Sequence, residues 1–129
     1  RDAGSDHIEC WGTGSASREF LYVDDCAKGI IRAAEVLDEP TPINLGTCME
    51  ITIRDLVGLI AKLSGFEGEI RWDATKPDGQ PRRCLDTTTA ADRLDWKAAV
   101  GFEDGLRRTI DWFIENRREI EAVEAAAAD

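Results

Sequence analysis

The chain has 129 residues, with 26 Asp and Glu against 16 Lys and Arg, and its formal net charge is −10. An acidic chain without a basic stripe argues against nucleic acid as a partner, and no apolar run approaches the roughly 18 residues that a membrane span needs. The length fits one domain, and a composition of 43% hydrophobic and 33% charged residues is ordinary for a globular protein.

The first third of the chain predicts two short strands and one helix. His7–Trp11 is predicted as a strand, followed by a turn over residues 12–15 and a second strand at Glu19–Tyr22. Asp24 or Asp25 is suited to cap the N-terminus of the helix. Apolar residues then recur at helical spacing, at Ala27, Ile30, Ala34 and Leu37.

Two prolines end this helix and introduce a short apolar strand. Pro40 and Pro42 precede Ile43–Leu45, and Gly46 follows it.

A second helix is predicted directly after Thr52. Thr52 and Asp55 resemble a capping box, and Gly65 provides the stop signal. The apolar positions between them are Ile53, Leu56, Val57, Ile60 and Leu63.

The second half predicts one more strand and two more helices. Glu69–Trp72 is predicted as a strand, Thr87–Leu94 as a short helix, and Phe102 begins an amphipathic helix that runs to about Glu121. The tail Ala125–Asp129 is predicted to fray. Because strands and helices alternate, the predicted class is mixed α/β.

A cationic loop follows the strand at residues 69–72. Lys76, Arg82 and Arg83 lie within eight residues, in a segment stiffened by Pro77 and Pro81. Arginine donates paired hydrogen bonds to phosphate oxygens, so a loop of this kind on an acidic chain indicates a phosphate site. The alternative is a solvated turn with three charged side chains.

Other motifs give little chemistry. The turn at residues 12–15 superficially matches a dinucleotide-binding loop, but the third glycine is missing and a strand-like segment follows instead of a helix. His7 is expected at the surface, and helix capping explains Asp24 and Asp25 better than paired catalytic carboxylates. The four cysteines lack Cys-x-x-Cys spacing, so we expect reduced, mostly buried thiols in a cytoplasmic protein and no metal site.

Several segments, taken in order, resemble the C-terminal part of the extended short-chain dehydrogenase/reductase family of nucleotide-sugar epimerases, reductases and dehydratases. The segments are Trp11-Gly12-Thr13-Gly14, Arg18-Glu19-Phe20-Leu21-Tyr22-Val23-Asp24-Asp25, Ile43-Asn44-Leu45-Gly46-Thr47, Glu50-Ile51-Thr52-Ile53, Lys76-Pro77-Asp78-Gly79-Gln80-Pro81-Arg82-Arg83, Leu85-Asp86-Thr87-Thr88, Phe102-Glu103-Asp104-Gly105-Leu106 and Ile110-Asp111-Trp112-Phe113. The Lys-Pro-Asp-Gly-x-Pro-Arg stretch is the most discriminating of them, and it resembles the GDP-L-fucose synthase branch.

The resemblance implies a larger enzyme that uses NADP or NAD. Residues 1–124 would be the sugar-nucleotide-binding portion, with residues 24–46 normally packed on a Rossmann domain. Since the chain begins at Arg1 and its one methionine is Met49, we expect that it was cut from a longer protein. The cofactor-binding domain and the catalytic residues would then lie upstream, so this chain alone would bind no cofactor and be inactive.

The resemblance also implies contacts with a nucleotide-diphosphate sugar. Trp11 would pack near the nucleotide, Arg18 and Arg83 would hold the diphosphate, and Asp78 would accept hydrogen bonds from the nucleoside. The alternatives are core packing for Trp11, an ion pair for Arg18, a surface position for Arg83 and a turn-forming role for Asp78. Lys76 and Arg82 are neighbouring candidates. A non-catalytic nucleotide-binding or interaction module, or another nucleotide-sugar epimerase or dehydratase, is the alternative function.

Three positions depart from the family pattern. Cys48 and Asp95 stand where glycine is usual, and Thr89 replaces an arginine.

Without a Rossmann domain, the helix at residues 24–37 would expose its apolar stripe, so self-association through it is predicted.

Overall fold

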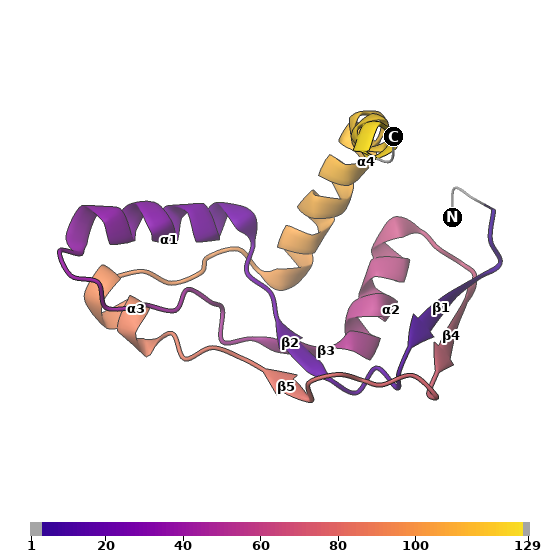
Figure 1. The fold of residues 1–129 in the computed structure, drawn as a ribbon, viewed down its shortest axis with the longest axis horizontal. Helices are drawn as coiled ribbons and strands as arrows, with labels where there is room; N and C mark the ends of the chain where they lie inside the picture. The colour runs from indigo at the N-terminus through magenta and orange to yellow at the C-terminus, as the bar shows by residue number, and fades with distance from the viewer. Residues whose placement is uncertain (1–3, 128–129) are drawn as a thin grey trace.

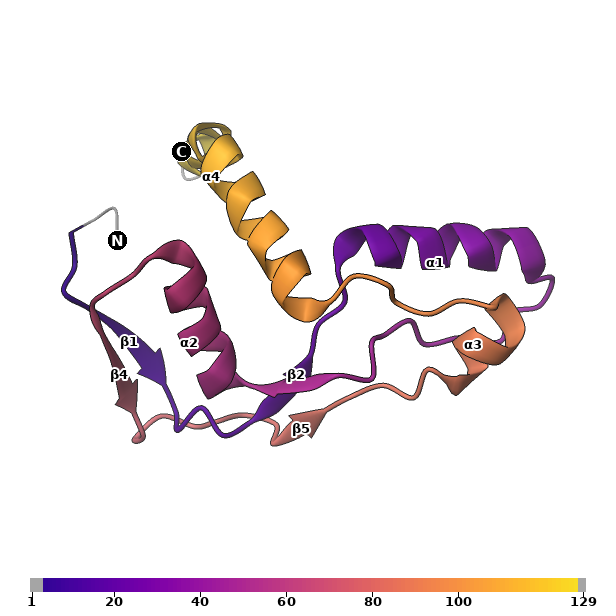
Figure 2. The ribbon, with the colours of Figure 1, turned by 180° about the vertical axis from the view of Figure 1, so that it is seen from behind.

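The computed structural model describes residues 4–127, and from residue 120 onward the backbone alone. In chain order the elements are β1 (His7–Trp11), β2 (Ser17–Glu19), α1 (Val23–Val36), β3 (Glu50–Thr52), α2 (Ile53–Ser64), β4 (Glu69–Asp73), β5 (Arg82–Arg83), α3 (Thr88–Leu94) and α4 (Phe102–Ala127). The predicted mixed α/β class is confirmed. The molecule is elongated, with α1 and α3 at one end, α2, β1 and β4 at the other, and α4 rising between them (Figure 1). The view from behind shows β2 and β5 in the stretch that joins the two ends (Figure 2).

The strands form two small sheets. β1 and β4 pair in parallel, from His7↔Glu69 to Trp11↔Asp73. The carboxyl ends of parallel strands meet at one edge, so Trp11 lies beside the start of the cationic loop. In the other sheet β2 lies between β3, to which it is antiparallel, and β5, to which it is parallel.

One predicted strand was wrong in position, and β5 was not predicted as a strand. The strand predicted at Glu19–Tyr22 lies at Ser17–Glu19, because only these residues have ladder partners. The end of the cationic loop, predicted without regular structure, forms β5 through the pairs Ser17↔Arg82 and Arg18↔Arg83. In both cases the position of the strand depends on pairing with a segment that is distant in sequence. The residues of one segment alone do not indicate such a partner.

Neither Asp24 nor Asp25 is the N-cap of α1, contrary to the prediction. The N-cap is Tyr22, without a side-chain capping bond. The Asp25 side chain is 2% exposed, and its Oδ2 accepts hydrogen bonds from the backbone N–H groups of Ala99 (2.8 Å) and Val100 (2.7 Å). This carboxylate therefore ties the first turn of α1 to the segment that precedes α4.

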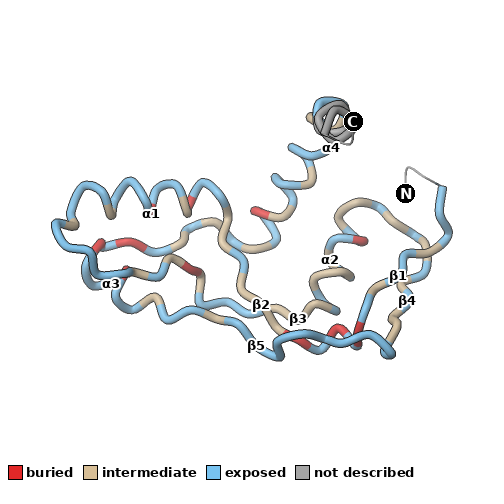
Figure 3. The backbone as a smooth tube through the Cα atoms, viewed as in Figure 1, coloured by how far each residue is buried: buried red, intermediate tan, exposed pale blue. Residues whose placement is uncertain are grey.

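The main core lies where α1 meets α3. Leu94 and Trp96 are buried there, with Leu37, Ile43 and Leu45 packed against them. The predicted strand at 43–45 was wrong, since these residues pair with no strand and contribute packing instead. Figure 3 shows how sparse the buried positions are along the chain.

The outer face of α1 is apolar and exposed. Val23 is 68% exposed, and Ile30 and Ile31 are each 59% exposed. Of the predicted stripe, Ala27, Ile30 and Ala34 are exposed, whereas Leu37 packs on the core. The predicted exposure of this stripe is therefore confirmed for most of its length.

The helix predicted after Thr52 is confirmed. The Thr52 hydroxyl accepts a hydrogen bond from the Asp55 backbone N–H (3.0 Å) and donates one to Asp55 Oδ2 (2.6 Å). Gly65 closes α2 in the left-handed conformation. At the other end of the chain α4 continues past the predicted end to Ala127, and residues 128–129 of the predicted frayed tail lie outside the described part.

Both positions where glycine is usual have a left-handed backbone. Cys48 (φ 58°) and Asp95 (φ 48°) are the non-glycine residues with positive φ in the part of the chain that the structure describes. A side chain strains this conformation, and Asp tolerates it better than Cys.

Asp95→Gly is expected to raise the free energy of unfolding by about 0.5 kcal/mol, because Asp95 ends α3 with φ 48° and ψ 44°. Denaturant titration would measure it. Gly65→Ala is the matched opposite, at φ 67° at the end of α2, and should lower stability by roughly 1 kcal/mol. A destabilising Asp95→Gly would contradict the assigned strain.

Candidate anion-binding site

Arg18 and Arg83 lie side by side. They are partners in the parallel β2–β5 ladder, so their side chains leave the sheet on the same face. Both line one cavity of about 300 Å³, whose other lining residues are Glu19, Phe20, Leu21, Leu45 and Leu85. Arg18 is half-buried and Arg83 is exposed. The structure therefore brings together the two arginines that the resemblance assigns to a diphosphate.

Neither arginine is neutralised by a neighbouring carboxylate. Arg18 Nη1 donates a hydrogen bond to the Ser17 carbonyl oxygen at 2.6 Å. Within residues 4–119, no ion pair joins Arg18 or Arg83 to an Asp or Glu. The alternative of an ion pair for Arg18 is therefore wrong, and both guanidinium groups keep donors available for an external anion.

Arg82 differs from its neighbour. Its Nε lies 3.0 Å from both carboxylate oxygens of Glu50, and its Nη2 lies 2.5 Å from Oε1. The Ser17 hydroxyl donates to the same carboxylate at 2.8 Å. The hydrogen bond from Arg82, and then that from Ser17, hold the pKa of Glu50 below its usual range. Arg82 thus locks β5 to β3, and its predicted contact with a ligand stays a prediction.

Trp11 lies on the surface beside Lys76. The indole is 68% exposed, so the alternative of core packing is wrong. Lys76 Nζ lies 5.5 Å from the ring centroid, within range of a cation–π contact. An exposed aromatic face with a cation beside it can stack on a planar ring, so the predicted role of Trp11 stays open.

Asp78 holds the turn at residues 12–15. Its Oδ1 accepts hydrogen bonds from the backbone N–H groups of Thr13 (2.6 Å) and Gly14 (3.2 Å), and its Oδ2 accepts one from the Thr13 hydroxyl (2.7 Å). Gly12 has φ 81°, and a Cβ there would lie 2.4 Å from Asp78 Oδ1. The carboxylate therefore fastens the cationic loop to the turn after β1, and its predicted contact with a nucleoside stays a prediction.

Acid is expected to release this contact. Hydrogen bonds from the Thr13 hydroxyl, and then from the Thr13 backbone, lower the pKa of Asp78 below its ordinary value of 3.8. A lowered folded-state pKa stabilises the contact above pH 3.8, and this contribution is lost as pH falls through the folded-state pKa. The Thr13 and Gly14 amide resonances should titrate with a midpoint below 3.8. The titration should vanish in Asp78→Asn, and a midpoint at or above 3.8 would contradict the assignment.

The same turn does not fit a dinucleotide. It leads into β2, so no helix N-terminus follows it to hold a pyrophosphate. The Arg54 guanidinium instead covers the Trp72 ring at 4.5 Å and donates a hydrogen bond to the Thr13 carbonyl.

Sequence reasoning missed Glu19. Its Oε1 accepts hydrogen bonds from the backbone N–H groups of Thr47 and Cys48 (3.3 Å), and its Oε2 accepts one from Leu85 (2.8 Å). Burial alone would raise the pKa of Glu19, but the hydrogen bonds from Leu85 and Thr47 outweigh it and lower the pKa. No spacing rule links Glu19 to these distant amides. The one sequence signal was its place in the Arg18–Asp25 segment.

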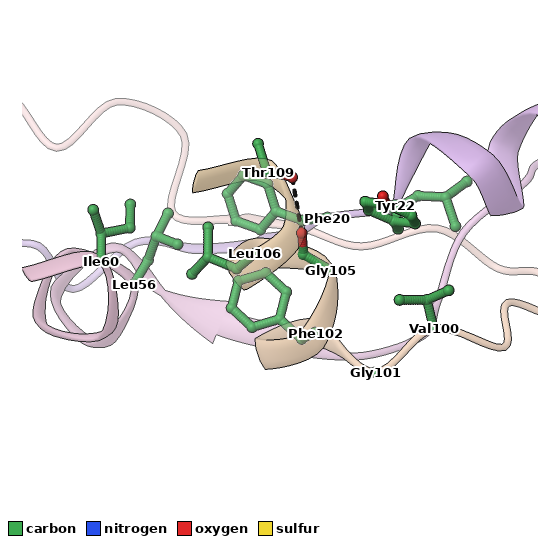
Figure 4. Close-up of a pocket in the computed structure, with 11 residues that line it drawn as sticks. Phe20, Tyr22, Leu56, Ile60, Val100, Gly101, Phe102, Gly105, Leu106 and Thr109 are labelled. Atoms are coloured by element: carbon green, nitrogen blue, oxygen red, sulfur yellow. Dashed lines mark hydrogen bonds between the residues drawn. The ribbon is translucent and has the colours of Figure 1, made fainter. Parts of the chain in front are cut away.

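A second cavity, apolar and of about 270 Å³, is also lined by Phe20 and Leu21. Figure 4 shows Leu56 and Ile60 of α2 facing Leu106 of α4 across it. The Phe20 and Phe102 rings lie 5.8 Å apart. Two cavities of different character therefore share one short segment, and the charged chemistry lies in the one that holds the arginines.

The remaining sequence candidates give no further site. Among the residues described, no group of His, Cys, Asp and Glu side chains could hold a metal ion, and none of the helices combines the length and the apolar composition of a membrane span. His7 is partly exposed, with Nδ1 2.7 Å from Asp6 Oδ1. The cysteines are free thiols, but the expectation that most are buried was wrong, since Cys48 is exposed and the other three are intermediate.

Solved structures define the class of the fold. The UDP-glucose 4-epimerase of Thermotoga maritima, solved with UDP-glucose, matches with a TM-score of 0.77 and 27% identity, over 85% of this chain and 35% of that chain. An epimerase from Methanothermobacter thermautotrophicus matches with a TM-score of 0.82 and 26% identity, over 91% and 35%. The chain therefore has the fold of part of an extended short-chain dehydrogenase/reductase.

Sequence comparisons show which family and which relatives the chain resembles. The NAD dependent epimerase/dehydratase family matches residues 2–46. GDP-L-fucose synthase 1 of Arabidopsis thaliana is 42% identical over 113 residues, covering 88% of this chain and 35% of the relative. GDP-L-fucose synthase of Escherichia coli (strain K12) is 42% identical over 119 residues, covering 85% and 37%. The chain is therefore similar to the NAD-dependent epimerase/dehydratase family, and it spans about a third of the length of the curated relatives it matches.

Proposed function

We propose that this chain is the nucleotide-sugar-binding portion of a cytoplasmic, GDP-L-fucose synthase-like, NAD(P)-dependent epimerase and reductase. The observation that carries the proposal is the pair Arg18 and Arg83, which share a ladder position and a cavity and have no carboxylate partner within residues 4–119. In a chain of net charge −10, two adjacent unpaired guanidinium groups suit a doubly charged ligand. The relatives named GDP-L-fucose synthase support a nucleoside diphosphate sugar as that ligand.

Different residues of the chain contact different parts of the nucleotide sugar. Arg18 and Arg83 hold the diphosphate, and Trp11 stacks near the nucleoside with Lys76 beside it. Asp78 accepts hydrogen bonds from the nucleoside through its remaining lone pairs and also fixes the turn at residues 12–15. The whole enzyme would epimerise a 4-keto-6-deoxy sugar by proton transfer and reduce the ketone with hydride. This chain would supply positioning for that chemistry.

We place the cofactor and the catalytic residues in a Rossmann domain outside this chain. NAD(P) supplies the hydride when it is bound there, and this chain alone is expected to be inactive. The turn at residues 12–15, which leads into β2, supports the absence of a dinucleotide site at that turn.

Calorimetric titration with GDP, UDP and NADPH tests the proposal. We expect GDP to bind with a Kd in the micromolar range, from two or three charge-assisted hydrogen bonds of about 1.5–3 kcal/mol each. UDP should bind more weakly and NADPH should not bind. A preference for UDP would favour another nucleotide-sugar epimerase or dehydratase. Binding of neither GDP nor UDP would favour a non-catalytic interaction module.

We also propose that the exposed face of α1 is an interface. In the whole protein this face of α1 packs on the Rossmann domain. In the chain alone, the same face packs on a second copy of the chain. The exposure of Val23, Ile30 and Ile31 supports this proposal. A monomer by light scattering at high concentration would contradict the self-association.

A further inference from the structure

Glu19 joins three segments that are distant in sequence. The Thr47 and Cys48 amides lie 28 and 29 residues away along the chain, and the Leu85 amide lies 66 residues away. The carboxylate accepts a hydrogen bond from each, so one side chain fastens β2 to the segment after α1 and to the segment after β5.

These attachments lie next to both arginines. Glu19 directly follows Arg18, and Leu85 comes two residues after Arg83. The β2–β5 ladder that aligns the arginines has two residue pairs. So short a ladder defines its register weakly, and the bond from Leu85 N–H to Glu19 Oε2 (2.8 Å) extends the attachment beyond it.

Gly46 shows how closely the backbone approaches this carboxylate. A Cβ at Gly46 would lie 2.0 Å from Glu19 Oε1 and 3.1 Å from its Cδ. A side chain at position 46 would displace the carboxylate, so the contact depends on glycine there.

The carboxylate also lines the cavity of the two arginines without pairing with them. Glu19, Arg18 and Arg83 all contribute to that cavity, yet no ion pair joins Glu19 to either arginine. Its oxygens are oriented by the three backbone N–H groups instead.

We propose that Glu19 is the positioning residue of the anion site: it fixes the spacing of Arg18 and Arg83 through Leu85 and is itself held away from their guanidinium groups. The identity of the anion as a nucleoside diphosphate rests on the proposed function, whereas the positioning role does not.

The sign of the effect of Glu19→Gln separates positioning from simple electrostatics. Removing a negative charge beside two arginines should strengthen anion binding on Coulombic grounds. The amide NH₂ of Gln cannot accept the hydrogen bonds that one carboxylate oxygen accepts, so loss of positioning should weaken binding. We expect GDP and inorganic pyrophosphate to bind about tenfold more weakly by calorimetry. Glu67→Gln, at an exposed carboxylate in a loop, is the matched control and should change neither.

Gly46→Ala is a second substitution that should weaken anion binding. It leaves Glu19 intact and displaces its carboxylate, which could then neutralise the arginines. The GDP:GMP affinity ratio should fall in both variants, because the second phosphate depends on the arginine pair. A general loss of structure would lower both affinities alike.

Amide hydrogen exchange tests the positioning role of Glu19 without any ligand. In Glu19→Gln the Thr47, Cys48 and Leu85 amides should exchange faster, whereas the amides of β1 should not change. Unchanged exchange at Leu85, or tighter pyrophosphate binding, would overturn the positioning role. If the unaltered chain binds pyrophosphate but not GDP, the proposed function fails and the positioning role remains.

Discussion

Replacing Arg18 and Arg83 together with glutamine is expected to weaken GDP binding at least about a hundredfold. Each guanidinium would lose charge-assisted hydrogen bonds of about 1.5–3 kcal/mol, and about 1.4 kcal/mol corresponds to a tenfold change in affinity. Calorimetry or equilibrium dialysis with GDP would measure the loss. Each single variant should show a smaller loss, because the remaining arginine still contacts the diphosphate.

The matched control is Arg107→Gln on α4. Arg107 is exposed and pairs with Glu103 one turn away, at 3.2 Å. The Arg107→Gln substitution removes one positive charge away from the cavity, as many as each single variant removes within it, so GDP affinity should change less than about twofold. Affinity retained by the double variant, or lost equally in Arg107→Gln, would contradict the assignment of the site.

Asp25→Ala is expected to give the largest loss of stability, about 3 kcal/mol. The substitution leaves the Ala99 and Val100 N–H groups without their acceptor at a side chain that is 2% exposed. An unsatisfied buried donor costs about 1–3 kcal/mol. Urea denaturation followed by circular dichroism would measure the change in the free energy of unfolding.

Asp24→Ala is the control for this loss. Asp24 is exposed and adjacent in sequence, so its replacement should change stability by about 0.5 kcal/mol or less. Asp25→Asn should lie between the two, since its amide keeps one acceptor oxygen. A loss below about 1 kcal/mol in Asp25→Ala would show that the segment before α4 is held by other contacts.

Local signals were sufficient for several elements of the fold. The Thr52–Asp55 cap and the Gly65 stop place α2 because both act within a turn of the helix. Cys48 and Asp95 stand out as replacements for glycine, and both have positive φ. The replaced glycines therefore indicated the left-handed backbone conformation at both positions.

Elements that depend on distant partners could not be placed from the sequence. β5 exists because Arg82 and Arg83 pair with β2 across more than half of the chain. Asp25 has the residue type and position of a helix cap, but its acceptor bonds go to Ala99 and Val100. A pattern shows which residue can accept a hydrogen bond, and the tertiary fold decides which donor reaches it.

The candidate site likewise has residues that the sequence indicated and contacts that it did not. The order of segments suggested Arg18 and Arg83, and the structure sets them at one ladder position. It also gives Asp78 and Arg82 internal partners that the sequence did not indicate. Glu19 was missed because the three backbone N–H groups that donate to it lie on other segments.

The sparse core has a thermodynamic consequence. The buried hydrophobic residues of the described part are Ala16, Ala61, Ala90, Leu94 and Trp96. The heat capacity increment of unfolding scales with the apolar area that becomes hydrated, and alanine contributes little of it. A scanning calorimeter should therefore record a small heat capacity step and a broad endotherm, with an enthalpy per residue below the roughly 0.7 kcal/mol typical near 60 °C.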